Sequence, residues 1–323
     1  MKPLFTVSLL LSAAGALRAQ PAAVQQFQNF QLSQPSLLNN LMAGTNAPDL
    51  YRGENEDVGP QRILRLNPRP KRFDVTLDSQ VFYTDNANFA LSPDNIGSFV
   101  FVNTFQAAFT PPPVTWGPGN FAPAIGLASQ WYNYGKPSMQ AFDFEAQTLF
   151  VNGKYSLGLW QIGLGASYNR LVDQSSYDET YREFLPNLGV QRIVPLCQKL
   201  FLVLGDQVAY HFSQEPLLPG SRADINNRFD NTVNVSLNWQ VAGRVIVQPF
   251  YRFQYSFYPY NTAQTGGRND FFHGAGLTVA WYATSQVTCR AFFNYNLKRT
   301  DDAYIPAFEE LNGGAGLSFD WKF

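Results

Sequence analysis

The stretch Ala315–Phe323, AGLSFDWKF, ends the chain and determines the predicted fold. Side chains alternate between the two faces of a β-strand. One face of this stretch therefore carries Ala315, Leu317, Phe319, Trp321 and Phe323. The other face carries Gly316, Ser318, Asp320 and Lys322. The alternation predicts a strand with one apolar face and one polar face.

A chain that ends on such a strand resembles bacterial outer-membrane β-barrel proteins, in which an aromatic last strand closes the barrel. The resemblance covers roughly residues 73–323 and rests on architecture rather than on a diagnostic motif. It implies that Phe319, Trp321 and Phe323 form the signal that the barrel assembly machinery recognises. It also implies that outer-membrane lipid surrounds the protein.

The N-terminus predicts export from the cytoplasm. Residues 1–19 begin with the positively charged Met1-Lys2, continue with an apolar run to Gly15 and offer small residues for cleavage up to Ala19. This is the organisation of a secretory signal peptide. A membrane anchor is the alternative, but the run is too short to cross a hydrocarbon core of ~30 Å.

The composition narrows the class of the exported protein. Aromatic residues make up 15% of the chain, and charged residues also make up 15%, which is below the ~25% typical of soluble domains. Such a chain fits a secreted β-sandwich or a membrane β-barrel with aromatic girdles. The net charge of −1 gives no indication of nucleic-acid binding. The two cysteines, Cys197 and Cys289, cannot form a disulfide framework.

Residues 20–72 differ from the rest of the chain because they are polar and rich in proline. Ser36–Met42 is expected to form a short helix, and Asn67–Arg72 forms a stiff basic linker. We expect this region to be an irregular periplasmic arm, with a plug inside the barrel as the alternative. The segment Tyr51–Gln61, YRGENEDVGPQ, is distinctive but predicts no function.

Residues 73–323 predict an all-β fold, a transmembrane antiparallel β-barrel of about twelve strands, within a range of about ten to fourteen. The range reflects the irregular region 111–140. The expected strands are 73–83, 97–110, 123–134, 141–152, 155–169, 183–195, 199–212, 229–241, 244–258, 271–283, 286–298 and 313–323.

The connections between these strands favour a membrane barrel over a sandwich. Short turns are expected at Asn152-Gly153-Lys154, Leu196-Cys197-Gln198, Ala242-Gly243 and Ala283-Thr284. Long polar loops are expected at Asp173–Arg182, Gln214–Arg228, Asn261–Asp270 and Arg299–Asn312. Membrane barrels have short periplasmic turns and longer outer loops, so both termini are expected in the periplasm. Two connections do not fit: 111–122 is long where a short turn is expected, and Gly135–Gln140 is short.

The polar faces of the strands predict a charged lumen. The candidate residues are Asp74, Asp78, Asp143, Glu145, Arg252, Arg290, Lys298, Asp320 and Lys322. Two interpretations remain open. Acids on the first and fourth strands and bases on the ninth and eleventh would set up a transverse field across a pore for small polar solutes. Alternatively, the charges form salt bridges that fill a narrow lumen. The function predicted from these faces is a porin-like channel, with a non-conducting structural or surface-interaction barrel as the alternative.

Catalysis, metal binding and cofactor binding have little support in the sequence. His211 and Ser213 share the lumen face, but neighbours at this spacing lie ~7 Å apart, and His273 falls on the lipid face. A barrel enzyme acting on lipids is therefore the weaker alternative to a channel. The carboxylates of Asp301-Asp302 and Glu309-Glu310 lack regular ligand spacing, so a solvated loop is expected there rather than a calcium site.

Overall fold

The structure is a computed structural model that describes residues 71–90, 93–214, 223–260, 267–301 and 307–323. The predicted signal peptide (1–19), residues 20–70 of the predicted arm, and the segments Ser36–Met42 and Tyr51–Gln61 lie outside the described residues. Among the described residues, no helix is long and apolar enough to cross a membrane.

The described residues form thirteen strands and one short 3-10 helix, η1 (Pro137–Phe142). The strands are β1 (Phe73–Thr84), β2 (Ser98–Phe109), β3 (Val114–Trp116), β4 (Gly119–Tyr134), β5 (Phe144–Leu157), β6 (Trp160–Asp173), β7 (Glu179–Cys197), β8 (Leu200–Gln214), β9 (Arg228–Ala242), β10 (Val245–Tyr258), β11 (Arg268–Tyr282), β12 (Val287–Thr300) and β13 (Phe308–Lys322).

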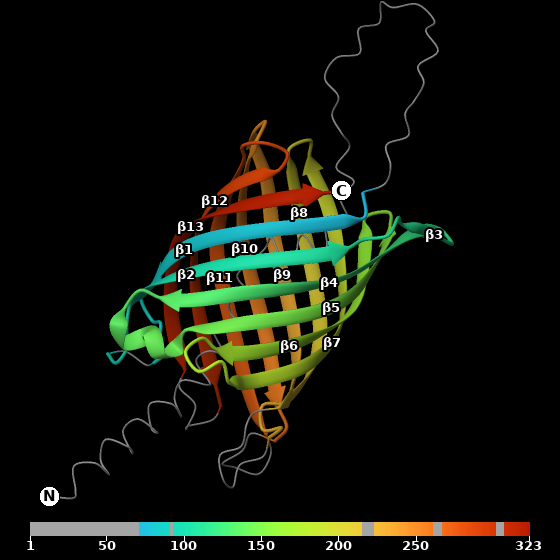
Figure 1. Ribbon diagram of the computed structural model, residues 1–323. Coiled ribbons are helices and arrows are strands. Elements are labelled where there is room, and N and C mark those ends of the chain that lie inside the picture. The colour runs from blue at the N-terminus through green and yellow to red at the C-terminus, as the bar shows by residue number, and fades with distance from the viewer. Residues whose placement is uncertain (1–70, 91–92, 215–222, 261–266, 302–306) are drawn as a thin grey trace, which may run out of the picture.

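Twelve of these strands form one closed antiparallel barrel, which confirms the predicted fold (Figure 1). Around the ring, each strand pairs with the strands before and after it in the sequence, except that β2 pairs directly with β4 and β3 pairs with β4 alone. The pairing of β1 with β13 closes the ring. The closing pair runs from Asp74 opposite Lys322 to Thr84 opposite Asn312. A sandwich would consist of two separate sheets, so the single closed sheet excludes the β-sandwich alternative.

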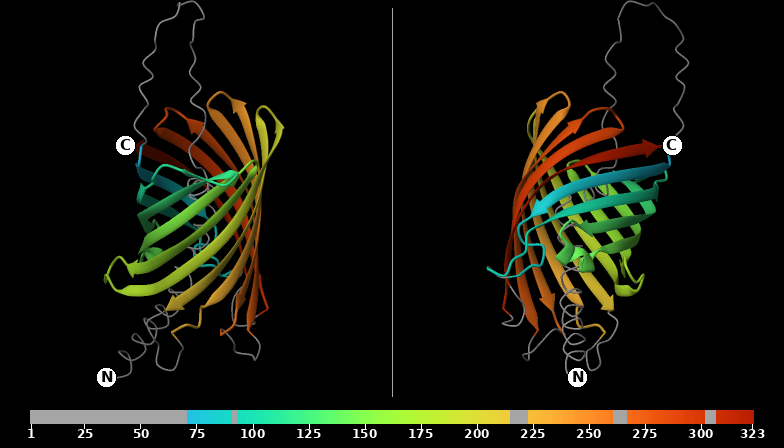
Figure 2. Two further views of the ribbon diagram at one scale, coloured as in Figure 1. Left: turned by 90° about the vertical axis from the view of Figure 1, so that its right-hand side faces the viewer. Right: turned by 60° about the vertical axis from the view of Figure 1, so that its left-hand side comes forward.

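The two ends of the barrel differ in their connections, as Figure 2 shows from two sides. At the end we call the turn end, β1 begins, β13 ends, and the turns 158–159, 198–199, 243–244 and 283–286 connect strands. At the opposite end, the loop end, the connections are 85–97, 135–143, 174–178, 215–227, 259–267 and 301–307. Short turns thus gather at one end and most of the longer connections at the other.

Several predicted boundaries were wrong because strands continue further than the sequence pattern indicates. Asn152-Gly153-Lys154 lies inside β5, where the ladder with β6 continues to Leu157 opposite Trp160. The turn follows instead at Gly158, which adopts a φ of +58° that glycine accepts without strain. The predicted loop Asp173–Arg182 shrinks to 174–178 for the same reason.

The two connections that did not fit the predicted pattern have structural explanations. Residues 111–122 contain β3, which pairs with the first residues of β4 to form a hairpin at the turn end. Its Trp116 ring packs edge-on against Phe121 and Tyr155. Residues 135–140 lead into η1, which occupies the loop end between β4 and β5.

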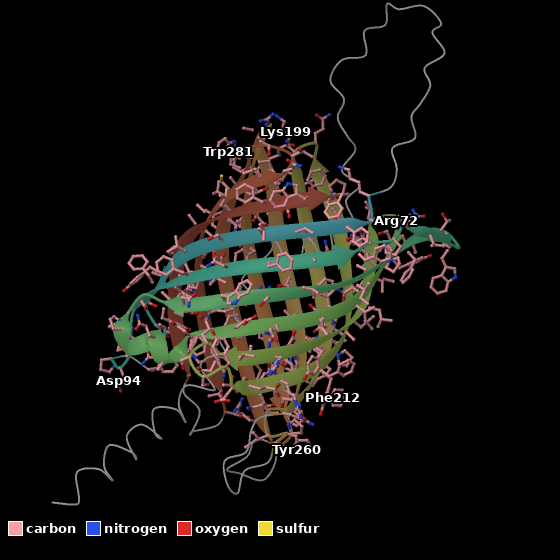
Figure 3. All side chains as sticks on the ribbon, in the orientation of Figure 1. Arg72, Asp94, Lys199, Phe212, Tyr260 and Trp281 are labelled. Atoms are coloured by element: carbon pink, nitrogen blue, oxygen red, sulfur yellow. The ribbon has the colours of Figure 1, made fainter. Side chains whose placement is uncertain are left out.

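The outside of the barrel is apolar. Large hydrophobic side chains on the outward face are widely exposed, including those of Phe99, Leu149, Leu164, Trp239 and Phe293. Exposed aromatic side chains occur at both ends, with Trp281 at the turn end and Phe212 at the loop end (Figure 3). An apolar outer band flanked by aromatic residues is the surface that a membrane-spanning barrel presents to lipid.

The inward face of β13 is bare next to the point where the barrel closes. Gly314 and Gly316 both point inward there, and a Cβ atom on Gly314 would lie 2.3 Å from the Val81 carbonyl oxygen. Side chains of β12 and β1 therefore meet over β13. The rings of Phe292 and Phe82 lie 6.0 Å apart, and Arg290 crosses to β1. We call this arrangement the seam clamp.

Candidate functional site: the interior of the barrel

The wall from β5 to β9 is polar but largely uncharged toward the turn end. Its inward-facing side chains are mostly amides and hydroxyls, separated by glycines. They include Asn152, Gly163, Gly165, Ser167, Asn187, Gly189, Gln191, Gly205, Gln207, Asn234, Ser236 and Asn238. Lys154 and the apolar Ile193, Phe201 and Val203 also face inward near the turn end. Such side chains hydrogen-bond readily to water and to neutral polar molecules.

Seven of the nine predicted lumen residues face inward. They are Asp74, Asp78, Arg252, Arg290, Lys298, Asp320 and Lys322. In the seam clamp, Arg290 Nη2 lies 2.6 Å from Asp78 Oδ1. Lys322 Nζ lies 3.9 Å from Asp74 Oδ1 at the turn end, and Asp320 Oδ1 accepts a hydrogen bond of 2.6 Å from the Thr76 hydroxyl.

The other two predicted lumen residues lie elsewhere. Asp143 follows η1 at the loop end rather than lying in a strand, and its Oδ1 accepts the backbone N–H of Tyr134 at 2.8 Å. Burial raises the pKa of the Asp143 carboxyl, although the hydrogen bonds from Tyr134 and Asn133 oppose the shift.

Glu145 faces outward, which corrects the sequence-based placement. Because Phe144 and Ala146 occupy the buried inward positions of β5, Glu145 falls on the opposite face. There its carboxylate accepts hydrogen bonds from Ser129 and Gln147. The inward charges consequently do not separate into the acidic and basic walls that a transverse field requires.

A buried charged network, not predicted from the sequence, lies inside the loop end on β7, β8 and β9. His211 is its centre: Nδ1 lies 2.8 Å from Glu183 Oε2 and Nε2 lies 2.9 Å from Asp230 Oδ2. Arg228 Nε donates to the same Asp230 oxygen at 3.0 Å. Since ionised carboxylates only accept hydrogen bonds, the two carboxylate contacts favour a His211 ring with a proton on both nitrogens. Arg228 Nη2 also lies 2.9 Å from Nδ1. With His211 protonated in this way, the positive charges of His211 and Arg228 balance the negative charges of Glu183 and Asp230.

The charged network continues onto the neighbouring strands. Asp270 lies 3.1 Å from Arg268 Nε and 2.9 Å from Lys298 Nζ. The Tyr258 ring lies between the two arginines, with the guanidinium carbon of Arg268 3.7 Å and that of Arg228 5.8 Å from its centroid. The sequence pattern missed most of this network because it placed Arg228, Arg268 and Asp270 at or beyond the strand ends.

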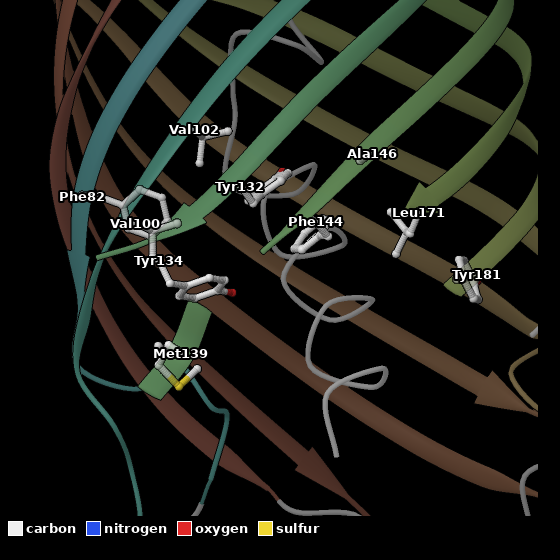
Figure 4. Packing of buried hydrophobic residues seen from close by; sticks show 11 residues of the cluster. Phe82, Val100, Val102, Tyr132, Tyr134, Met139, Phe144, Ala146, Leu171 and Tyr181 are labelled. Carbon is white, nitrogen blue, oxygen red and sulfur yellow. The ribbon is translucent and has the colours of Figure 1, made fainter. Parts of the chain in front are cut away.

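The remaining part of the loop end is filled by an apolar cluster (Figure 4). Its members lie on β1, the connection 85–97, β2, β4, η1, β5, β6 and β7, and comprise Phe82, Ala87, Val100, Val102, Tyr132, Tyr134, Met139, Phe144, Ala146, Leu171 and Tyr181. The rings of Tyr132 and Phe144 are stacked with centroids 4.3 Å apart. The inner surface at this end is therefore apolar on one side and charged on the other.

The connection 85–97 turns into the barrel and joins the two sides of the loop end. Phe89 is 2% exposed, and its ring packs edge-on against Phe308 at 4.9 Å and against Phe272. It adopts a φ of +51°, which is strained for a side chain of this size. Asn86 holds the connection in place, because its Nδ2 donates to the carbonyl oxygens of Ala90 (2.9 Å) and Glu309 (2.8 Å).

The candidate catalytic and metal-binding residues that the structure describes do not come together in a site. Ser213 donates its hydroxyl hydrogen bond to Asn227 rather than to His211. His273 lies on the outward face, within 2.8 Å of the Tyr251 hydroxyl. Among the described residues, no group of three or more His, Cys, Asp or Glu side chains is placed to hold a metal ion. Asp302 lies outside the described residues.

Glu309 and Glu310 belong to β13 rather than to the predicted loop, because β13 begins at Phe308. Glu310 points inward and accepts hydrogen bonds of 3.0 Å from Thr84 and from Asn296. Both cysteines are free thiols.

The chain resembles solved membrane barrels in fold. An outer membrane channel from Pseudomonas putida F1 is 11% identical over 84% of this chain and 100% of that chain, with a TM-score of 0.50. The NanC porin (10% identity, 75% and 98% coverage, TM-score 0.43) and the KdgM porin in complex with disordered oligogalacturonate (10% identity, 76% and 98% coverage, TM-score 0.38) also match. No model of a protein family matches the chain, and no curated protein is similar in sequence. At these identities the likeness establishes the fold alone.

Proposed function

We propose that this protein is an outer-membrane channel through which small polar solutes pass passively. The observation that carries the proposal is the chemistry of the two faces, with an apolar outside and, toward the turn end, an inside lined mainly by amides, hydroxyls and charges. A barrel whose whole interior is a packed core would place apolar side chains along its full length. The wall from β5 to β9 instead offers hydrogen bonds that need water or a polar solute as partner.

The proposed location is the outer membrane, with the turn end in the periplasm and the loop end outside the cell. The predicted signal peptide supports export, and short turns are typical of the periplasmic side of membrane barrels. Both ends of the barrel sequence, Phe73 and Phe323, then lie on the periplasmic side. The predicted arm, residues 20–72, would lie in the periplasm, with a plug as the alternative.

We also propose that the outward aromatic residues of β13 are read by the barrel assembly machinery. Phe323 is 66% exposed and stacks on Phe73 at 5.9 Å, and Phe319 stacks on Trp321 at the same distance. Because this surface is accessible at the end of the last strand, deletion of Phe323 is expected to lower the amount of folded protein in the outer-membrane fraction. Leu311→Ala is the control, because it changes an exposed outward side chain at the far end of β13, and it should leave that amount unchanged.

A second candidate function is a non-conducting structural or surface-interaction barrel. The packing inside the loop end favours the non-conducting barrel. The opening at this end is narrowed by the apolar cluster, the charged network and Phe89. Catalysis is not proposed, since Ser213 and His211 share no hydrogen bond that would activate a nucleophile.

Conductance across a planar lipid bilayer separates the two functions. The folded protein is expected to produce discrete, repeatable current steps when added to one chamber, whereas boiled protein should produce none. A protein that inserts, as judged by protection from protease, and yet gives no steps would contradict the channel and support the sealed barrel.

A further inference from the structure

We propose that Arg252 and Lys154 make the lumen selective for anions, and that its solutes are small polar carboxylates. This inference rests on the proposed channel function and adds the class of solute to it. It follows from a difference among the inward-facing cations: most of them form an ion pair with a carboxylate of the described residues, whereas Arg252 and Lys154 do not.

Most cations on the inward faces of the described strands have a carboxylate partner. The pairs are Arg228 with Asp230, Arg268 and Lys298 with Asp270, Arg290 with Asp78, and Lys322 with Asp74. Within the described residues, Arg252 and Lys154 lie in no such pair. Their positive charges are therefore not cancelled locally by the barrel wall that the structure describes.

The neighbouring strands explain why these two cations lack partners. Lys154 lies opposite Ala122 on β4 and Gly163 on β6, neither of which has a side-chain acceptor. Arg252 lies between Asn234 on β9 and Gly274 on β11. Its Nε donates to Asn234 Oδ1 at 2.8 Å, which fixes the guanidinium and leaves its outer nitrogens without an acceptor among the described residues.

Both side chains are mostly buried, with Arg252 5% and Lys154 7% exposed, but their free donors are not sealed off completely. The polar atoms that are fully buried without a partner, within the described residues, do not include Lys154 Nζ or the outer nitrogens of Arg252. An isolated cation sealed away from water would carry a large desolvation cost. Water or a passing anion must therefore reach these atoms.

The two cations lie on different walls and at different depths. Four strands separate β5 from β10 on one side of the ring and six on the other, so the walls nearly face each other. Arg252 is at the middle of β10, whereas Lys154 is close to the turn end of β5. A solute that crosses the lumen thus passes one uncancelled positive charge and then the other.

The surroundings of Arg252 favour a carboxylate with hydroxyl groups. A guanidinium presents its N–H donors in a planar fork that matches the two oxygens of a carboxylate. Asn234, Thr232 and Gln254 lie beside it and can exchange hydrogen bonds with hydroxyl groups. Two inward acids, Asp320 and Glu310, form no ion pair within the described residues. They lie near opposite ends of the barrel, where Thr76 donates a hydrogen bond to Asp320 and Thr84 and Asn296 donate to Glu310.

Reversal potentials across a planar bilayer under a potassium chloride gradient test the inference. The unmodified channel is expected to favour chloride over potassium, and Arg252→Gln is expected to lower that permeability ratio by about fivefold, from the interaction of unit charges ~4 Å apart in water. Lys154→Gln should shift the ratio in the same direction, and the double variant should shift it furthest. With potassium gluconate replacing the chloride on one side, Arg252→Gln should reduce gluconate permeability as well.

Arg192→Gln is the matched control, because it removes the same charge from the outward face, where Arg192 lies over the Trp160 ring at 5.0 Å. It should leave the reversal potential unchanged. Conducting Arg252→Gln and Lys154→Gln variants with unaltered selectivity, or an unmodified channel that favours potassium, would overturn the inference and leave the channel function intact. Insertion without conductance in the unmodified protein would instead overturn the channel function itself.

Discussion

Replacing Arg228 with Met is expected to destabilise the barrel by about 3–5 kcal/mol, the cost of breaking a buried ion pair by removing one partner. Arg228 is 1% exposed and donates to Asp230, which also accepts from His211. Without the guanidinium, the carboxylates of Glu183 and Asp230 share the single positive charge of His211. The free energy of unfolding in urea, followed by tryptophan fluorescence in detergent micelles, measures the loss.

Arg299→Met provides the control, because the Arg299–Glu309 pair also joins an arginine to a carboxylate, at 3.3 Å, but both side chains are 57% exposed. Exposed pairs contribute about 0–1 kcal/mol, so this variant should unfold nearly like the unmodified protein. The double variant Arg228→Met/Asp230→Leu should recover part of the lost stability, since it leaves Glu183 and His211 as a balanced pair. Equal losses for Arg228→Met and Arg299→Met would show that the buried network is not what stabilises the loop end.

Replacing Phe89 with Gly is expected to increase the unitary conductance of the channel. The change removes the ring that packs on Phe308 inside the loop end. It also relieves the positive φ of residue 89, because glycine adopts this conformation without the cost of about 1–2 kcal/mol that a Cβ atom brings. The mouth should therefore widen without new backbone strain, and single-channel recordings at fixed salt measure the change.

Tyr177→Gly isolates the effect of the ring from the effect of the backbone. Tyr177 also has a positive φ, of 60°, but its side chain is 77% exposed in the connection between β6 and β7. Its replacement should relieve comparable strain and leave the conductance unchanged. If Phe89→Gly also conducts like the unmodified channel, Phe89 does not limit the flow of ions.

The sequence pattern predicted the architecture well because strand alternation is a local property. The polar and apolar positions of Ala315–Phe323 were assigned to the correct faces, and so were Arg252, Arg290 and Lys298. Errors arose where a local turn signal competes with pairing between long strands. An Asn-Gly pair at 152–153 has a strong local preference for a turn, yet pairing along β5 and β6 prevailed there.

The site was harder to predict because it depends on which strands become neighbours. Arg228 and Asp230 gain their importance from Glu183 and His211, which are brought to them by the pairing of β7, β8 and β9. Lys154 was overlooked because it was assigned to a turn. Phe89 could not be placed inside the barrel, since nothing in the residues around it specifies that the connection 85–97 turns inward.

The seam clamp bears on how this barrel can be re-engineered. The first and last strands are tied together from within by side chains that reach over Gly314 and Gly316, and the Phe323 N–H donates to the Phe73 carbonyl oxygen at 3.0 Å. In a chain shortened to start at Phe73, Phe73 and Phe323 are thus close enough to be joined by a short linker. Fresh ends can then be opened at Gly243, where an added Cβ would meet no atom within 4 Å. A circularly permuted chain of this kind would place the β1–β13 pairing in the middle of its sequence, as a hairpin, instead of between its first and last strands.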